Sequence, residues 1–148
     1  MRKTIVFAIA STVVLAACAS IKNFGAPQPF DAQNPRVYVI QGQQQLYPAV
    51  DQEPIVFASN KGRVKIRWHL QDSNYKFDRA AGIGIVAKPI HGLHNALASC
   101  ASDASDDSVF ACENDTSVRG TFKYTIKIVP KRSGDPVPEP LDPTVVNG

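Results

Sequence analysis

The stretch RVKIRWHL, residues 63 to 70, decides the fold class, because polar and apolar side chains alternate along it. The apolar positions are Val64, Ile66, Trp68 and Leu70. A period of two is typical of a β-strand that buries one face, whereas a helix repeats every 3.6 residues. The same alternation runs through TFKYTIKI, residues 121 to 128, which follows Gly120. Both stretches therefore predict half-buried strands.

Shorter runs extend this pattern along the chain. β-branched or aromatic segments predict further strands at Val37–Ile40, Ile55–Ala58, Ile83–Ala87 and Val109–Cys112. Only Leu93–Ser99 has a composition that favours a turn or two of helix. Six or seven short strands separated by turn residues predict an all-β fold, a small antiparallel β-sandwich.

In strand count and size the predicted domain resembles immunoglobulin-like and cupredoxin-like sandwiches. It departs from both patterns in its chemistry. An immunoglobulin domain has its core tryptophan between two bridged cysteines, whereas Trp68 precedes both Cys100 and Cys112. A cupredoxin binds copper through Cys, His and Met near its last hairpin, but no His follows Cys112 and the only Met is Met1. Copper chemistry of that type is not expected, and neither is any other cofactor.

The first residues have the layout of an export signal. Arg2 and Lys3 form a positive end, and Ile5–Leu15 is an apolar segment of about a dozen residues. Spanning a bilayer takes about 20 such residues. The sequence Leu15-Ala16-Ala17-Cys18 resembles the lipobox of bacterial lipoproteins. An ordinary secretory signal is the alternative.

The lipobox resemblance implies that residues 1–17 are removed and that Cys18 carries a lipid. It places the protein in the bacterial cell envelope, facing the periplasm and anchored to a membrane. In such lipoproteins an Asp beside the modified cysteine favours the inner membrane, whereas Ala19 and Ser20 stand here. The resemblance therefore implies the outer membrane more than the inner one.

The remaining cysteines, Cys100 and Cys112, have one possible pairing in an oxidising compartment. We expect a structural disulfide, with a metal-binding or a redox-active thiol pair as the alternatives. The spacing is far from CxxC, which argues against both alternatives.

Composition sets the expected domain limits. Residues 18–35 contain three prolines without a sustained period and predict a flexible tether. Residues 131–148 are also rich in proline, which disfavours central strands, and predict a C-terminal tail. The sandwich domain is therefore expected at residues 36–130. Without residues 1–17 the chain keeps 14 of its 16 basic side chains against 13 acidic ones, so nucleic acid is not an expected partner.

Two groups of polar residues are candidate binding sites. If the two alternating strands are neighbours, five cations form one anion-binding face: Arg63, Lys65, Arg67, Lys123 and Lys127. The alternative is that these are solvated charges that also protect a strand edge. Three histidines, His69, His91 and His94, could hold zinc or copper if the fold brings them together, with unliganded surface histidines as the alternative.

No catalytic motif is visible, including GxSxG and phosphate-binding glycine loops. The sequence therefore predicts a non-catalytic, lipid-anchored binding or accessory module of the cell envelope, which recognises a protein or an anionic envelope component. The alternative function is periplasmic metal binding through the histidines.

Overall fold

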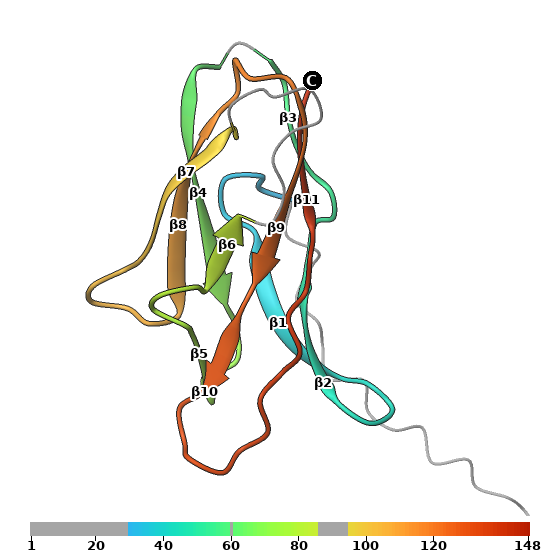
Figure 1. Cartoon of the computed structure of the whole chain (residues 1–148), viewed down its shortest axis with the longest axis vertical. Helices are drawn as coiled ribbons and strands as arrows, with labels where there is room; N and C mark the ends of the chain where they lie inside the picture. The colour runs from blue at the N-terminus through green and yellow to red at the C-terminus, as the bar shows by residue number, and fades with distance from the viewer. Residues whose placement is uncertain (1–29, 60, 86–94) are drawn as a thin grey trace, which may run out of the picture.

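A computed structural model describes residues 30–59, 61–85 and 95–148 of the chain (Figure 1). These residues form strands and loops, and no helix occurs among them. The strands are β1 (Arg36–Gln41), β2 (Leu46–Val50), β3 (Ile55–Phe57), β4 (Arg63–Leu70), β5 (Tyr75–Phe77), β6 (Ile83–Ile85), β7 (Leu97–Ser102), β8 (Val109–Asp115), β9 (Gly120–Ile126), β10 (Ile128–Pro130) and β11 (Thr144–Asn147). Within the described ranges, no helix is long and apolar enough to cross a membrane.

The strands form two main sheets that pack face to face, so the predicted all-β sandwich is confirmed. One sheet has five strands in the order β2-β1-β4-β8-β7, and the other has four in the order β3-β11-β9-β6. Strands β10 and β5 form a separate pair. The sheets are mixed, because β1 runs parallel to β4 and β11 runs parallel to β3. Alternation reports a buried face but not the direction of the neighbouring strand, so the purely antiparallel expectation is corrected.

The two alternating stretches are interior strands of opposite sheets. Strand β4 buries Ile66 and Trp68 completely, and β9 buries Tyr124 completely. The rings of Trp68 and Tyr124 meet across the core with centroids 5.2 Å apart, and Trp68 Nε1 donates a hydrogen bond of 3.3 Å to the Tyr124 hydroxyl. Burial raises the pKa of Tyr124 well above its usual value. The hydrogen bond satisfies both polar groups where water is excluded.

The N-terminal limit of the domain lies before residue 36. The Arg67 amide donates to the Gln33 carbonyl (2.7 Å), and the His69 amide donates to the Pro35 carbonyl (2.9 Å). Ala32 packs against the core cluster. The end of the predicted tether therefore lies along β4 and extends the pairing of β1, whereas residues 18–29 lie outside the described residues.

The prediction that residues 131–148 form a tail outside the domain is wrong, because β11 lies between β3 and β9. Its Val145 is fully buried. Asn147 on β11 and Asn114 on β8 exchange two hydrogen bonds of 3.0 and 3.1 Å, which join the two sheets. The prolines end at Pro143, and the β-branched run Thr144–Val146 after it can pair as a strand.

The helix expected at Leu93–Ser99 is also corrected in its described part, since Leu97–Ser102 is strand β7, whereas residues 93 and 94 lie outside the described residues. Leu97 pairs with Asn114 and is buried in the core. Pairing with β8 and burial of Leu97 override the weak helical preference of an alanine-rich segment.

Candidate functional site

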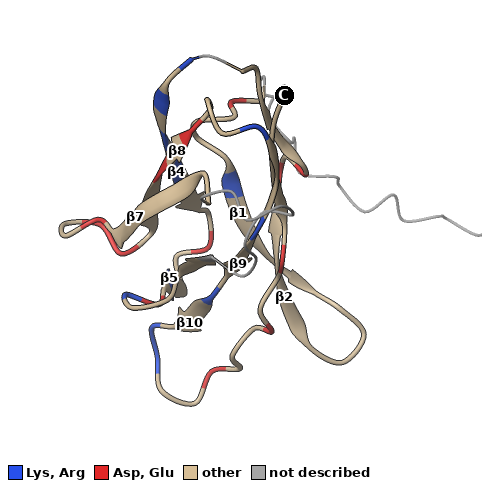
Figure 2. Cartoon of the chain, turned by 45° about the horizontal axis from the view of Figure 1, so that its top comes forward, with Lys and Arg blue, Asp and Glu red and all other residues tan. Residues whose placement is uncertain are grey.

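The five predicted cations do not form one face. Arg63, Lys65 and Arg67 are exposed on β4, on the outer side of the five-stranded sheet. Lys123 on β9 and Lys127 after it are exposed on the other sheet. Since β4 and β9 turn their apolar sides toward each other, their cations point away from each other. The expected common face is therefore corrected to the β4 row alone, and Figure 2 shows the charged residues over the molecule.

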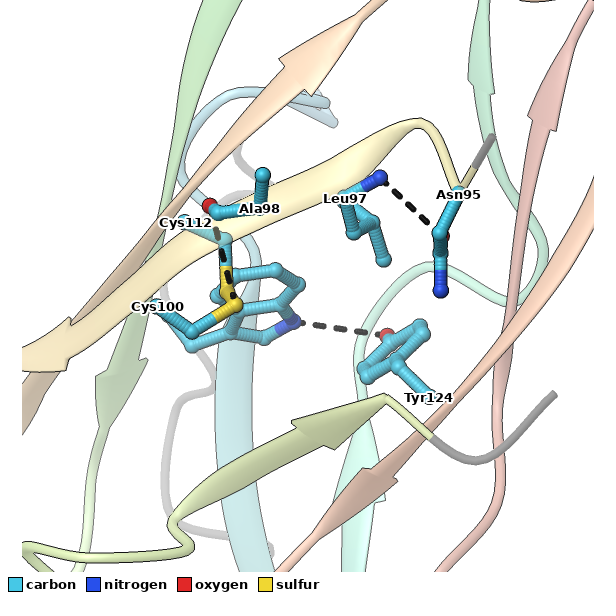
Figure 3. The surroundings of a disulfide bond; sticks show 7 residues. Asn95, Leu97, Ala98, Cys100, Cys112 and Tyr124 are labelled. Carbon is cyan, nitrogen blue, oxygen red and sulfur yellow. Dashed lines mark hydrogen bonds between the residues drawn. A yellow bond between two sulfur atoms is a disulfide. The ribbon is translucent and has the colours of Figure 1, made fainter. Parts of the chain in front are cut away.

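The expected disulfide joins Cys100 on β7 to Cys112 on β8 (Figure 3). It lies at a β-bulge, because Ala98 pairs with Glu113 and Ala101 pairs with Ala111. Two residues of β7, Ser99 and Cys100, therefore lie opposite Cys112 alone. Ser99 has a φ of 51°, in the left-handed region that residues other than glycine rarely adopt. The disulfide holds this irregular segment against β8.

A hollow of about 250 Å³ lies next to the bulge, on the outer side of the five-stranded sheet. Lys65 and Arg67 line it, together with Ser99, Ala101, Ser102, Asp103, Ala104, Val109 and Ala111. The side chains from β7 and β8 are mostly small, whereas those from β4 are long. A hollow results because alanine and serine do not fill the space beside the two cations. Ammonium, guanidinium and hydroxyl groups are donors that suit an anionic ligand.

The carboxylates near this hollow have other hydrogen-bond or ionic partners. Glu113 lies 3.9 Å from Arg63, and Asp103 accepts hydrogen bonds from the Ser105 hydroxyl (2.7 Å) and the Ser105 amide (2.9 Å). The hydrogen bond from the hydroxyl, followed by the one from the amide, is the main cause that holds the pKa of Asp103 below its usual value. Lys65 and Arg67 have no carboxylate within salt-bridge distance in the described part of the chain. Asp103, which also lines the hollow, is close enough to Lys65 that the Lys65 charge contributes to its lowered pKa, after the hydrogen bonds from Ser105.

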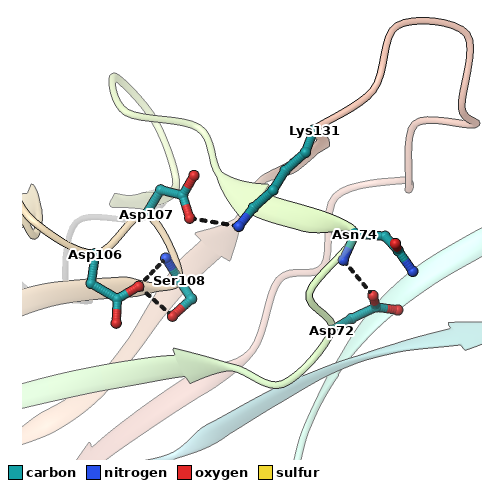
Figure 4. Close-up of polar contacts among 6 residues, drawn as sticks. All are labelled: Asp72, Asn74, Asp106, Asp107, Ser108 and Lys131. Atoms are coloured by element: carbon teal, nitrogen blue, oxygen red, sulfur yellow. Dashed lines mark hydrogen bonds and ion pairs between the residues drawn. The ribbon is translucent and has the colours of Figure 1, made fainter.

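Acidic residues of the loop after β7 stabilise the loop through hydrogen bonds and an ion pair. Asp106 accepts hydrogen bonds from the amide and hydroxyl of Ser108, and Asp107 pairs with Lys131 at 2.9 Å (Figure 4). Such Asp-x-Ser turns satisfy the backbone locally. Asp106 and Asp107 therefore have a structural role in this loop.

A larger hollow of about 430 Å³ adjoins the first one, and Ser99 lines both. Its charged lining residues are one cation, Arg63, and two carboxylates, Glu113 and Asp115. This mixed charge favours an anion less than the neighbouring hollow does.

The metal alternative cannot be built from the described residues. His69 Nε2 lies 3.4 Å from Asn34 Oδ1 on the outer side of β4, and His91 and His94 lie outside the described residues. Residues 30–59, 61–85 and 95–148 contain no group of three side chains able to hold a metal ion. Cys18 also lies outside the described residues.

Sequence reasoning found the cations of the hollow but missed its serines and its alanine floor, which depend on the bulge. It also missed the outer face of the β1–β2 hairpin, where Tyr38 and Ile40 are exposed. The signal was present, since residues 37–50 contain no Asp, Glu, Lys or Arg. No model of a known protein family matches the chain, and no curated protein matches it at a significant level.

Proposed function

We propose that this protein is a non-catalytic binding module of the bacterial cell envelope, anchored by a lipid on Cys18, and that it recognises a phosphate-bearing envelope component. The observation that carries the proposal is the hollow beside Lys65 and Arg67, where two cations with no salt bridge to a described residue border a floor of small residues. Phosphate oxygens accept charge-assisted hydrogen bonds from both cation types, and the serine hydroxyls supply further donors.

The anchor part of the proposal rests on the lipobox resemblance at Leu15-Ala16-Ala17-Cys18. From Cys18 to Phe30, the first described residue, a fully extended chain reaches about 40 Å at roughly 3.3 Å per residue. A domain on such a tether stays close to the membrane surface. Two or three acyl chains on Cys18 would hold it there stably, whereas one chain binds reversibly.

The ligand is tested by NMR titration of the full chain in an uncharged polyoxyethylene detergent. The probes are inorganic phosphate, glycerol phosphate and glucose 1-phosphate, with glucose as the neutral control. The last two phosphates separate a lipid head group from a phosphorylated glycan. We expect amide shifts around Lys65, Arg67 and Ser99, and binding that weakens as salt is added.

The variant Lys65→Ala with Arg67→Ala should lower phosphate affinity by at least about tenfold, because it removes both charge-assisted contacts. Lys123→Ala is the matched control, since it removes an exposed cation from the opposite sheet. Equal affinity in the double variant, or no shifts with any phosphate, would refute the anion site.

The anchor is tested separately by Cys18→Ala in cells, followed by membrane fractionation. We expect the variant to leave the membrane fraction or to accumulate unprocessed. Full retention of a processed variant would refute the anchor and leave the ligand proposal unaffected.

A further inference from the structure

The outer face of the β1–β2 hairpin is uncharged from residue 37 to residue 50, next to Arg36 at the start of β1. Residues 37–50 lack Asp, Glu, Lys, Arg and His, and four of them are glutamines near the turn. The hairpin extends away from the rest of the sandwich in Figure 1, and its turn carries no charged residue in Figure 2. Tyr38 and Ile40 are 38% and 48% exposed on this face.

Strand pairing places two tyrosines on this face. Tyr38 pairs with Ala49, and Ile40 pairs with Tyr47, so all four side chains share the outer side of the sheet. The cross-strand partner of Tyr38 is thus a small residue, Ala49. Diagonal residues of two paired strands lie about 7–8 Å apart, which sets the spacing of the two tyrosine positions.

Tyr47 is held in place by its neighbours. A Cβ on Gly42 would lie 2.7 Å from Tyr47 Cε2, so only glycine at position 42 permits the ring to pack there. Gln45 Nε2 donates a hydrogen bond to the Tyr47 hydroxyl. A ring that is already fixed loses little conformational entropy when a ligand binds.

Polar side chains adjoin Tyr38 at the end of β4. A hollow of about 290 Å³ is lined by Tyr38, Val39, Gln71, Asp72 and Ser73. One oxygen of Asp72 accepts a hydrogen bond of 2.9 Å from the Asn74 amide (Figure 4), and the other has no partner in the described part of the chain. Gln71 Nε2 donates to the His69 carbonyl at 3.0 Å, which leaves its side-chain oxygen as an acceptor. An exposed ring, a carboxylate, an amide and a hydroxyl thus line one hollow.

This combination fits one class of ligand better than the others. An anion is disfavoured, because the lining contains Asp72 and no cation. A second copy would need about 800 Å² of surface per partner, and the two exposed apolar side chains provide only a small part of that. Strand addition at the edge is hindered, because Pro48 has no amide proton and the Glu139 amide already donates to the Leu46 carbonyl (2.9 Å).

We propose that this face binds an uncharged oligosaccharide, with the Tyr38 ring against the C–H face of a sugar ring and with Gln71, Asp72 and Ser73 hydrogen-bonded to hydroxyl groups. The site is separate from the hollow beside Lys65 and Arg67. It stands whether or not that hollow binds phosphate.

The test is an NMR titration of the full chain, in the same sugar-free detergent, with tetra-N-acetylchitotetraose and with cellotetraose. We expect shifts of the Tyr38 and Gln71–Ser73 amides with at least one tetrasaccharide, and equal binding at low and high salt. Tyr38→Ala should lower the affinity by about tenfold, because it removes the aromatic contact, whereas Tyr38→Phe should retain most of it.

Two further variants make the test decisive. Asp72→Asn keeps an oxygen for the Asn74 amide but removes the charged acceptor, so it should also weaken binding. Val56→Ala is the matched control, because Val56 is 52% exposed on β3 in the other sheet. No shifts with either sugar at about 10 mM would overturn the proposal, as would unchanged affinity in Tyr38→Ala. A dimer in sedimentation equilibrium that Tyr38→Ala dissociates would assign the face to a second copy instead.

Discussion

The two halves of the five-stranded sheet present different outer surfaces over one continuous core. On β4, β8 and β7 the outer side carries exposed cations, carboxylates and small residues. A disulfide joins β7 to β8. On β1 and β2 it carries Tyr38, Ile40 and Tyr47, none of which is charged, and Arg36 at the start of β1 lies on the same side. The inner side is apolar in both halves, with Val37 and Trp68 fully buried.

This difference separates what folding requires from what it leaves free. A strand of a sandwich needs apolar residues only at every second position, facing the core. Charges on both halves would serve solubility equally well, and residues 37–50 lack them. Folding and solubility therefore do not account for the uncharged face, which is why we assign the two halves to different ligands.

The largest expected effect comes from removing the cross-link of the charged half. Cys100→Ala with Cys112→Ala should lower the free energy of unfolding by about 3 kcal/mol, because the bond closes a loop with a sequence separation of 12. Urea denaturation measures this change, with the oxidised parent chain as the control. In amide hydrogen exchange, β7 and β8 should lose more protection than β1 and β2. Equal loss in both halves would break the distinction between them, and an unchanged urea midpoint would contradict the role of the bond.

A smaller effect is expected on acidification. The pKa values of Asp103, Asp106 and Asp115 lie below the usual 3.8. In each case the largest cause is a hydrogen bond from the hydroxyl of the serine two residues later, and the second is a hydrogen bond from the backbone amide of that serine. Because these values are lowered in the folded state, the carboxylates contribute stability above pH 3.8, and the contribution is lost as the pH falls through the folded values. The hairpin has no carboxyl group between residues 37 and 50, so loosening should begin in the charged half.

Carboxyl NMR titration tests this prediction, with Ser105→Ala as the probe variant. The variant should raise the pKa of Asp103 and leave that of Asp115 unchanged, because Asp115 bonds to Ser117 instead. The prediction is contradicted if Asp103 titrates at 3.8 or above in the parent chain.

Much of the core was predictable, because alternation over residues 63–70 and 121–128 records a buried face directly. The β-branched or aromatic runs that predicted strands near β1, β3, β6 and β8 are confirmed, but several other short strands were missed. Pro48 masks the strand pattern of β2, Tyr75–Phe77 is too short to show a period, and β11 follows a run of prolines. Strand neighbours were also hidden, since alternation does not say which strand lies alongside. The prediction that five cations form one face was wrong for that reason.

The site was predictable only in its long side chains. Arg67 and Lys65 are visible as outward residues of a strand, whatever their neighbours are. The floor of the hollow depends on the register of β7 with β8 and on the bulge at Ser99, where two residues oppose one. Neither the register nor the bulge has a local sequence signature in the alanine- and serine-rich run from Ala96 to Ser102.

The smallest expected effect concerns the ion pair between Arg63 on β4 and Glu113 on β8. Arg63 and Glu113 lie 3.9 Å apart, with side chains 76% and 48% exposed. A double-mutant cycle with Arg63→Ala and Glu113→Ala should therefore give a coupling energy below about 1 kcal/mol that disappears at high salt, because water and ions screen exposed pairs. A coupling that is larger and independent of salt would show that the pair is shielded from solvent. In that case Glu113 would be firmly bound to Arg63, and the hollow beside Lys65 and Arg67 would be more strongly cationic than exposure alone indicates.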